Sequence, residues 1–240
     1  MTMNDWRDSL LVISLLLNTA IGTLAAYWLH RRGGLQRFSV KTINSIPPGA
    51  AVSIRRTLYR TFNGDSTVTH DPTVMFGDSL IAGGLWAEWY GPNVLNRGIG
   101  GETTADALLR SFDIAALHPA KIFIMLGTND YKAALAPETT IDNMRKVIAD
   151  LRAASPASEI YLQSILPPWS LKRESWTTQV NAMLEVIAEE NQVYWIDLCP
   201  RFAAGRFIDP RLTWDGVHLT PAGYQIWREV LEPYIVEEKR

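Results

Sequence analysis

The sequence predicts an α/β protein in which helices cover both faces of a parallel sheet. From Thr73 onward, short apolar runs alternate with longer segments of helical periodicity, which is the pattern of parallel strands joined by helices. Polar motifs begin where several of these runs end, and the carboxyl ends of parallel strands meet at one edge of a sheet. The five predicted strands are residues 73–76, 94–96, 121–126, 159–164 and 193–197.

Helices are predicted between these strands and after the last of them. The final helix begins with Thr220 as its N-cap and Pro221 in its first turn, and it extends to about Tyr234. Residues 51–62 are predicted to form a short strand or helix against the domain. The helices between the strands are predicted at residues 80–90, 103–117, 139–154 and 174–191.

Length and composition predict one sizeable domain with an appendage. The chain has 240 residues, of which 47% are hydrophobic and 20% charged, as is ordinary for a globular protein. Three parts follow from the pattern along it: an apolar segment with its flanks at residues 1–32, a basic linker with turn signals at residues 33–72, and the α/β domain at residues 73–240.

The amino-terminal segment has the length and composition of a membrane-spanning helix. From Ser9 to Leu29 there are 21 residues without a charge. At about 1.5 Å per residue this run would cross the roughly 30 Å hydrocarbon layer. Trp6 precedes the run, and Tyr27 and Trp28 lie at its far end, where aromatic rings favour the membrane interface. The sequence therefore predicts a single-pass membrane anchor.

Two other interpretations of this segment remain open. A cleaved signal peptide could use Leu24-Ala25-Ala26 as its cleavage site, but it would need a basic start and a shorter apolar core. A buried helix of a soluble protein is the second alternative. Because the start of the chain is net acidic and the apolar run is long, the retained anchor is favoured.

Basic residues cluster after the apolar run, in a stretch that we call the basic collar (residues 31–64). It contains seven Lys/Arg and no acidic residue, although the whole chain carries a net charge of −2. By the positive-inside rule it places the α/β domain on the cytoplasmic side, with an extracytoplasmic domain as the alternative. The collar could also hold the domain against anionic lipid headgroups, or be a solvated linker that only aids insertion. Its basic residues are Arg31, Arg32, Arg37, Lys41, Arg55, Arg56 and Arg60.

Three classes of protein are disfavoured by composition. The remainder of the chain is net acidic, so nucleic acid is not predicted as a partner. Cys199 is the sole cysteine, so no internal disulfide can form. No two histidines have metal-ligand spacing, which argues against a zinc enzyme, and no metal is predicted. The four histidines are His30, His70, His118 and His218.

A serine, a histidine and an aspartate supply the parts of a nucleophilic site. Ser79 follows the first predicted strand at a strand-to-helix turn, where the helix N-terminus favours developing negative charge. A neutral serine needs a base, and His218 is the histidine that lies in a turn-rich loop. Asp215, three residues earlier, is close enough to accept a hydrogen bond from the imidazole and fix its tautomer.

Acyl transfer also requires donors for the oxyanion of the tetrahedral intermediate. Three are available: the backbone N–H of Ser79, the backbone N–H of a glycine in Gly98-Ile99-Gly100-Gly101, and the side-chain amide of Asn129. Glycine suits this role because the backbone must approach the substrate closely. The alternative for Asn129-Asp130 is a simple turn.

These motifs resemble those of the SGNH hydrolases, also called the GDSL esterase/lipase family, over about residues 73–234. The resemblance implies Ser79 as the nucleophile, with His218 as its base and Asp215 as the residue that orients the base. It also implies Asn129 and Gly101, rather than Gly98 or Gly100, as oxyanion donors beside the Ser79 N–H. It implies a flavodoxin-like three-layer fold, no cofactor, and hydrolysis of esters or thioesters. Glu102 stands where aspartate is common. The matching blocks are Gly77-Asp78-Ser79-Leu80, residues 96–103, residues 127–130, and Asp215 with His218.

The substrate is less defined than the chemistry. Trp169 and Trp214 lie beside the motifs and are predicted to line the substrate site, where aromatic rings stack on sugars or hold acyl chains. Short-acyl, lysophospholipid-like and acetylated carbohydrate esters are the predicted substrates. Two alternatives stay open: an O-acyltransferase that uses the same triad, and an inert membrane-tethered interaction module.

Overall fold

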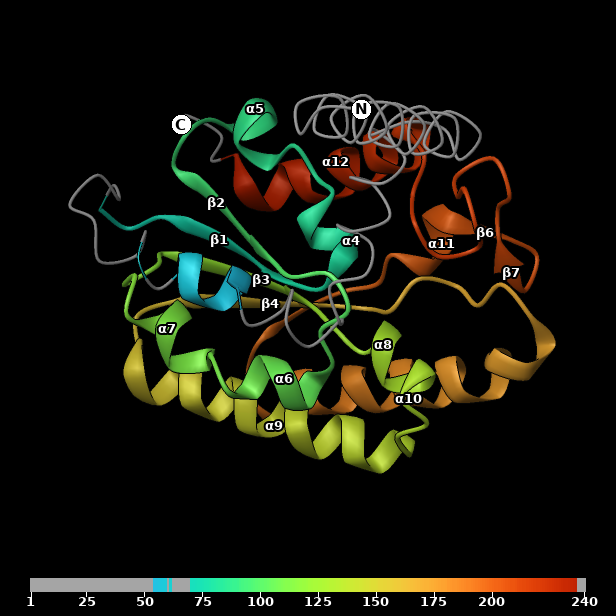
Figure 1. The fold of residues 1–240 in the computed structure, drawn as a ribbon, viewed down its shortest axis with the longest axis horizontal. Coiled ribbons are helices and arrows are strands. Elements are labelled where there is room, and N and C mark those ends of the chain that lie inside the picture. The colour runs from blue at the N-terminus through green and yellow to red at the C-terminus, as the bar shows by residue number, and fades with distance from the viewer. Residues whose placement is uncertain (1–53, 60, 62–69, 237–240) are drawn as a thin grey trace, which may run out of the picture. The chain divides into compact units, whose positions relative to one another are not determined.

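The computed structural model describes residues 54–59, 61 and 70–236. Its five-stranded sheet is parallel throughout, with the strand order β2-β1-β3-β4-β5 (Figure 1). All five strands coincide with predicted ones, so the expected parallel sheet is confirmed. The strands are β1 (Thr73–Gly77), β2 (Val94–Gly98), β3 (Lys121–Met125), β4 (Glu159–Gln163) and β5 (Tyr194–Ile196).

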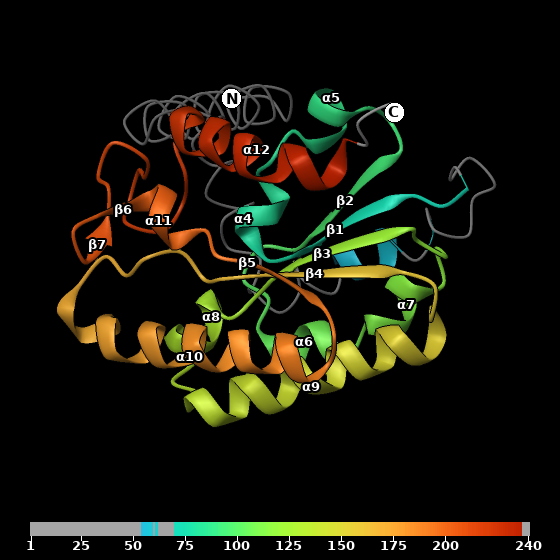
Figure 2. The same cartoon turned by 180° about the vertical axis from the view of Figure 1, so that it is seen from behind.

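Helices cover both faces of this sheet, which gives the three layers that the resemblance implied (Figures 1 and 2). One face carries α6 (Thr104–Leu108), α7 (Ser111–Ala115), α9 (Pro137–Ala154) and α10 (Leu171–Glu190). The other carries α4 (Ser79–Ala82), α5 (Trp86–Tyr90), α11 (Cys199–Phe202) and α12 (Pro221–Ile235). The remaining labelled elements are α8 (Thr128–Lys132) and a small hairpin of β6 (Ala203–Ala204) and β7 (Phe207–Ile208).

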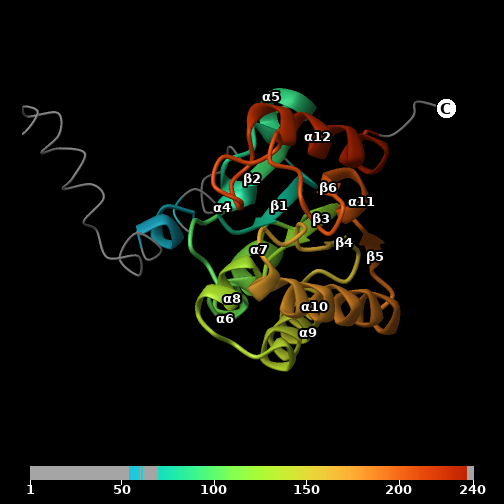
Figure 3. The ribbon, with the colours of Figure 1, turned by 90° about the vertical axis from the view of Figure 1, so that its right-hand side faces the viewer.

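The core consists of two apolar clusters, one on each face of the sheet, because side chains alternate along each central strand. On β1, Val74 and Phe76 belong to the apolar cluster under α9 and α10, whereas Met75 points into the cluster under α12. The second cluster contains Trp86 and Trp227, which meet edge to face at 5.2 Å between ring centroids. Trp86 is fully buried, so it belongs to the core, and it fixes α5 on the sheet. Figure 3 shows the sheet between the two helical layers.

Two predicted helices are each divided in two. The prediction of one helix over residues 80–90 was wrong, because the chain turns at Gly83-Gly84 between α4 and α5. A β-carbon on Gly84 would lie 2.3 Å from the Trp86 ring, so this turn requires glycine for Trp86 to enter the core. The helix predicted over residues 103–117 is likewise split between Leu108 and Ser111 into α6 and α7.

The segment before the sheet has a helix at residues 54–59, which settles the expectation of a strand or helix there. The predicted membrane anchor from Ser9 to Leu29, and most of the predicted basic collar, lie outside the described residues. Within residues 54–59, 61 and 70–236, none of the helices has the length and apolar character needed to cross a membrane.

Candidate active site

Ser79 lies at the first position of α4, directly after β1. The Asp78 side chain caps this helix by accepting a hydrogen bond from the backbone N–H of Leu80 at 2.9 Å. Gly77 permits the sharp turn, since a β-carbon there would lie 2.3 Å from the carbonyl oxygen of Met125 on the neighbouring strand. The first N–H groups of a helix have no intrahelical partner, so the start of α4 offers backbone donors beside the Ser79 hydroxyl, apart from the Leu80 N–H that Asp78 binds.

The structure brings Ser79, His218 and Asp215 together in a chain of hydrogen bonds. Ser79 Oγ lies 3.1 Å from His218 Nε2, and His218 Nδ1 lies 2.7 Å from Asp215 Oδ2. The other carboxylate oxygen of Asp215 accepts from the backbone N–H groups of Val217 and His218, at 2.9 and 2.8 Å. This tight turn needs Gly216, whose φ is +87°.

Hydrogen bonds keep Asp215 ionised. Partial desolvation opposes ionisation, but bonds from the His218 side chain and from the backbone of His218 and Val217 outweigh it and lower the pKa of Asp215 to about 2. An ionised Asp215 holds the His218 ring so that Nδ1 carries a proton and Nε2 faces Ser79 as an acceptor. The arrangement can therefore remove a proton from the serine hydroxyl.

The glycine loop after β2 supplies backbone donors beside Ser79. The N–H of Gly98 is occupied, because it donates to Asn96 Oδ1 at 2.9 Å. Among the described residues, the N–H groups of Gly100 and Gly101 donate no hydrogen bond, and Gly101 has a φ of +82°. Gly98 is thus unsuited to bind an oxyanion, while the assignment of that role to Gly101 stays a prediction.

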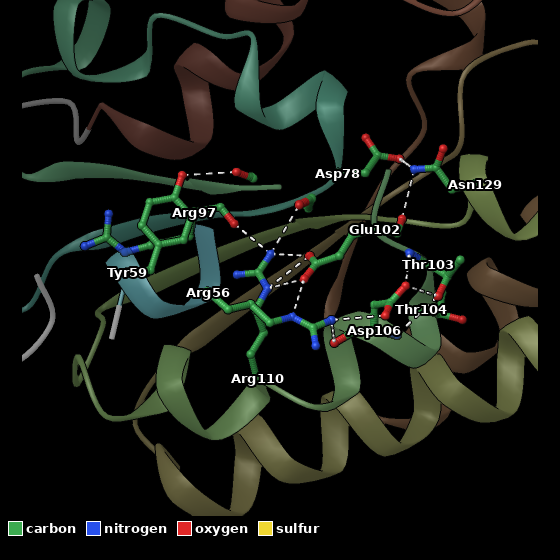
Figure 4. Close-up of polar contacts among 12 residues, drawn as sticks. Arg56, Tyr59, Asp78, Arg97, Glu102, Thr103, Thr104, Asp106, Arg110 and Asn129 are labelled. Carbon is green, nitrogen blue, oxygen red and sulfur yellow. Dashed lines mark hydrogen bonds and ion pairs between the residues drawn. The ribbon is translucent and has the colours of Figure 1, made fainter. Parts of the chain in front are cut away.

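Asn129 at the start of α8 connects the serine turn and the glycine loop. Its Nδ2 donates to the backbone oxygen of Glu102 at 2.9 Å and approaches Asp78 Oδ2 at 3.4 Å (Figure 4). Asp130, next to it, is not merely a turn residue, because its carboxylate accepts hydrogen bonds from the backbone N–H and the hydroxyl of Thr104. The Gly127–Asp130 stretch therefore anchors the glycine loop from the side of β3.

A buried ion pair that the sequence did not indicate lies under the glycine loop. Glu102 is fully buried and binds Arg110, whose Nε is 2.7 Å from Oε1 (Figure 4). Arg110 Nη2 also donates to the backbone oxygens of Arg97 at 2.8 Å and Gly77 at 3.3 Å. Arg110 thereby ties the ends of β1 and β2 to the loop. No such pair was expected from Glu102, although an acidic residue inside a glycine loop is the one feature of the sequence from which a nearby cation could have been inferred.

The helix at residues 54–59 holds the same loop from outside. Arg56 Nη2 donates to the backbone oxygen of Asp106 at 2.8 Å and to its carboxylate at 3.1 Å, and Arg56 Nε lies 3.4 Å from Glu102 Oε1 (Figure 4). The hydroxyl of Tyr59 donates to the Gly98 oxygen at 3.1 Å. One arginine of the basic collar is therefore directed at the domain itself rather than at solvent.

For the ester hydrolysis that the resemblance implies, Arg56→Ala is expected to lower kcat by about 2- to 10-fold with little change in KM, because the partly buried ion-pair network that holds the glycine loop contributes about 1 kcal/mol. The measurement is steady-state kinetics on the full chain, with Arg56→Lys expected to restore part of kcat. The neighbouring Arg55 is exposed, so Arg55→Ala is the matched control. An equal loss in both variants would contradict a specific contribution from Arg56.

The two tryptophans predicted to line the substrate site have different settings. Trp169 is half-buried and packs against Gly216, where an added β-carbon would lie 2.7 Å from Trp169 Cβ. Trp214 is 73% exposed, and its backbone N–H donates to the His218 oxygen at 2.8 Å. Trp169 thus backs the loop that carries His218, whereas the Trp214 ring extends into solvent.

Asp78 carries an unusual charge state. Burial raises its pKa to about 7, although the hydrogen bond from Leu80 and the charges of His218 and Arg173 act in the opposite direction. The folded protein therefore holds one more proton than the unfolded chain between about pH 4 and pH 7, and its free energy of unfolding falls as the pH rises through that window.

Asp78→Asn is expected to reduce this fall by up to about 3 kcal/mol between pH 5 and pH 8, because asparagine keeps an acceptor for Leu80 N–H and does not ionise. Urea unfolding at pH 5 and pH 8 measures the difference, with the exposed Asp142→Asn as control. If the wild type and Asp78→Asn lose the same free energy between the two pH values, Asp78 does not titrate in this range.

A serine at a helix start, a histidine within hydrogen-bond distance and an aspartate behind it define the class of serine hydrolases. Within that class, the chain belongs to the GDSL-like Lipase/Acylhydrolase family, whose model matches residues 64–226. The match confirms the resemblance that the four motifs indicated. It makes the chain an ester-hydrolysing enzyme.

Individual proteins and a solved structure are similar to this chain. The thioesterase 1/protease 1/lysophospholipase L1 of Escherichia coli (strain K12) is 26% identical over 162 residues, 62% of this chain and 75% of that protein. The uncharacterized lipoprotein YqeF of Bacillus subtilis (strain 168) is 38% identical over 79 residues, 25% of this chain, and the match spans only 32% of YqeF. The crystal structure of a GDSL-like lipase from Bacteroides thetaiotaomicron has a TM-score of 0.65 and 26% identity, covering 75% of this chain and 96% of that one.

Proposed function

We propose that the chain is a membrane-anchored serine esterase that acts through an acyl-enzyme on Ser79. The observation that carries this proposal is the continuous hydrogen-bond chain from Ser79 Oγ to His218 at 3.1 Å and from His218 to Asp215 at 2.7 Å. Such a chain activates a neutral hydroxyl, which is otherwise a weak nucleophile at neutral pH.

In the first half of the reaction, Ser79 Oγ attacks the acyl carbonyl carbon while His218 Nε2 takes its proton. The negative charge that develops on the carbonyl oxygen is stabilised by the N–H groups of Ser79 and Gly101 and by the Asn129 amide. The tetrahedral intermediate then collapses, the C–O bond to the leaving alcohol breaks, and His218 returns the proton to that oxygen. Asp215 stabilises the imidazolium that forms between these steps.

The second half releases the acyl group. His218 takes a proton from water, the hydroxyl attacks the ester carbon of the acyl-enzyme, and Ser79 leaves with the proton that His218 returns. Carboxylic esters with short acyl groups, lysophospholipid-like esters and acetylated carbohydrates are the proposed substrates. The lysophospholipase activity named for the Escherichia coli relative supports the lysophospholipid-like esters, and the thioesterase activity named for it adds thioesters to the proposed substrates.

The test is turnover by the full chain in detergent or vesicles. We expect hydrolysis of p-nitrophenyl esters with a preference for short acyl chains, and covalent labelling of Ser79 by a fluorophosphonate. Acetylated sugar and lysophospholipid are assayed beside them. An absence of turnover on every ester, together with no labelling of Ser79, would contradict the esterase proposal.

The membrane part of the proposal rests on the uncharged run from Ser9 to Leu29 and on the basic residues that follow it. We place the catalytic domain on the cytoplasmic side. Cys199 is a poor reporter of this, because burial raises the pKa of its thiol to about 11. A better probe is Glu189→Cys, at an exposed position, in a Cys199→Ser background. Labelling of intact cells by a membrane-impermeant maleimide would contradict the cytoplasmic placement.

A further inference from the structure

Arg173 on α10 is a charged side chain that the serine chemistry does not use. It is 2% exposed, and its guanidinium lies 4.2 Å from the ring centroid of Trp169 and 5.6 Å from that of Tyr131. Its one hydrogen bond within the described residues joins Nε to Thr177 Oγ1 at 3.2 Å. Two aromatic rings and one hydroxyl thus fix the position of the guanidinium.

Within the part of the chain that the structure describes, the terminal nitrogens of this guanidinium have no hydrogen-bond partner. No acceptor within residues 54–59, 61 and 70–236 binds Nη1 or Nη2 of Arg173. A buried cation normally has an ion-pair partner, since the loss of hydration is otherwise uncompensated. The fully enclosed side-chain nitrogens without a partner in the described chain are Gln163 Nε2 and Arg228 Nε. The Arg173 terminal nitrogens are not among them, so they retain an opening toward solvent.

Three parts of the catalytic site converge on Arg173. Tyr131 follows Asn129 by two residues on α8, so one contact comes from the oxyanion side. Trp169 packs against Gly216 in the loop that carries His218, so the other contact comes from the side of the base. Asp78, directly before Ser79, lies within electrostatic range of the guanidinium. Arg173 therefore lies beside the place where a substrate must bind.

We infer that Arg173 is an anion-binding residue of the substrate site, so that the preferred esters carry a carboxylate or a phosphate. Guanidinium groups bind both anions through two parallel N–H donors, and Arg173 has two terminal nitrogens to which no described residue is bonded. The aromatic contacts with Trp169 and Tyr131 hold the group in place before the ligand arrives, which reduces the entropy lost on binding. This inference rests on the proposed esterase function and specifies its substrate class.

A simpler role for Arg173 would be to neutralise Asp78. The charge state of Asp78 argues that this role is minor, because burial raises its pKa to about 7 in spite of Arg173. The Arg173 guanidinium itself is also poorly compensated, since burial lowers its pKa to about 10 while Asp78 and Tyr131 act in the opposite direction. No hydrogen bond within the described residues joins the two side chains. Each group thus keeps a large desolvation penalty that pairing would have removed.

The test compares ester pairs that differ only in charge. On the acyl side the pair is p-nitrophenyl hydrogen succinate and its methyl ester. On the alcohol side it is an acylglycerol 3-phosphate and the matching monoacylglycerol. Arg173→Gln is expected to raise KM for the anionic member of one pair by about 10- to 100-fold, and to change kcat/KM for the neutral member by less than about threefold. The pair that responds identifies the source of the anion.

Two controls keep the result interpretable. Lys172→Gln removes an exposed neighbouring charge and should leave both pairs unchanged, while Arg173→Lys should restore part of the loss. Fluorophosphonate labelling of Ser79 in Arg173→Gln at the wild-type rate shows that the site is intact. Equal losses on charged and neutral esters would show that Arg173 neutralises Asp78 or supports the fold. That result would overturn the inference.

A ligand measurement separates this inference from the proposed function. Succinate and inorganic phosphate are titrated against the Ser79→Ala full chain, with and without Arg173→Gln, and the midpoint of thermal unfolding is followed. A shift that depends on Arg173 supports an anion site even if no ester is turned over. Absence of a shift with either anion, in a protein that does hydrolyse esters, overturns the anion site and leaves the esterase proposal standing.

Discussion

Replacing Ser79 by alanine is expected to lower kcat for ester hydrolysis by about 10⁴- to 10⁶-fold, because removal of a triad nucleophile leaves only the oxyanion donors and substrate binding. The fold should persist, since the hydroxyl of Ser79 contacts His218 and lies at the surface end of the sheet rather than in either core cluster. Circular dichroism and thermal unfolding check the fold, and initial rates on a p-nitrophenyl ester check activity. Ser175→Ala, at an exposed position on α10, is the matched control.

A double variant makes this prediction sharper. If Ser79 and His218 act as one unit, Ser79→Ala combined with His218→Ala should be no slower than either single variant, because each removes the same step. Multiplicative losses would show that the two side chains act independently. In that case the 3.1 Å contact between them would not be a catalytic one.

Much of the fold was predictable because the central strands repeat one simple pattern. Residues such as Ile122, Phe123 and Ile124 are buried on both sides of the sheet, so the strand reads as a continuous apolar run. Helix boundaries were less predictable. Whether residues 80–90 form one helix depends on how Trp86 enters the core, and that contact is with Trp227, which is far away in sequence.

The candidate site divides in the same way. The motif residues were visible because their spacing is short and local, as with Asp215 and His218 in one turn. The residues that support the site could not be recognised from the sequence, because Arg110 and Arg56 contact Glu102 only in the folded protein. Arg173 was missed for a related reason: a lone arginine on an amphipathic helix reads as a solvated residue until its burial is known.

Asn129→Ala is expected to reduce kcat by about 10²- to 10³-fold, the usual effect of removing one oxyanion donor. The Asn129 amide has two hydrogens. One binds the Glu102 oxygen at 2.9 Å, and the other makes only a long contact of 3.4 Å with Asp78. A weakly bound donor can be redirected to a developing oxyanion at little cost. Measurement of kcat and KM on a short p-nitrophenyl ester tests the effect, which should fall mainly on kcat.

Two further variants test whether Asn129 acts as an oxyanion donor or only holds the glycine loop through its hydrogen bond to Glu102. Asn129→Asp preserves the shape of the side chain but replaces the donating nitrogen with an acceptor that faces the Glu102 oxygen, so it should be at least as slow as Asn129→Ala. Asn191→Ala, at the end of α10 and far from the site in the chain, should retain normal kcat. If Asn129→Ala instead raises KM with kcat unchanged, the amide binds substrate and transition state equally, and Asn129 does not act as an oxyanion donor.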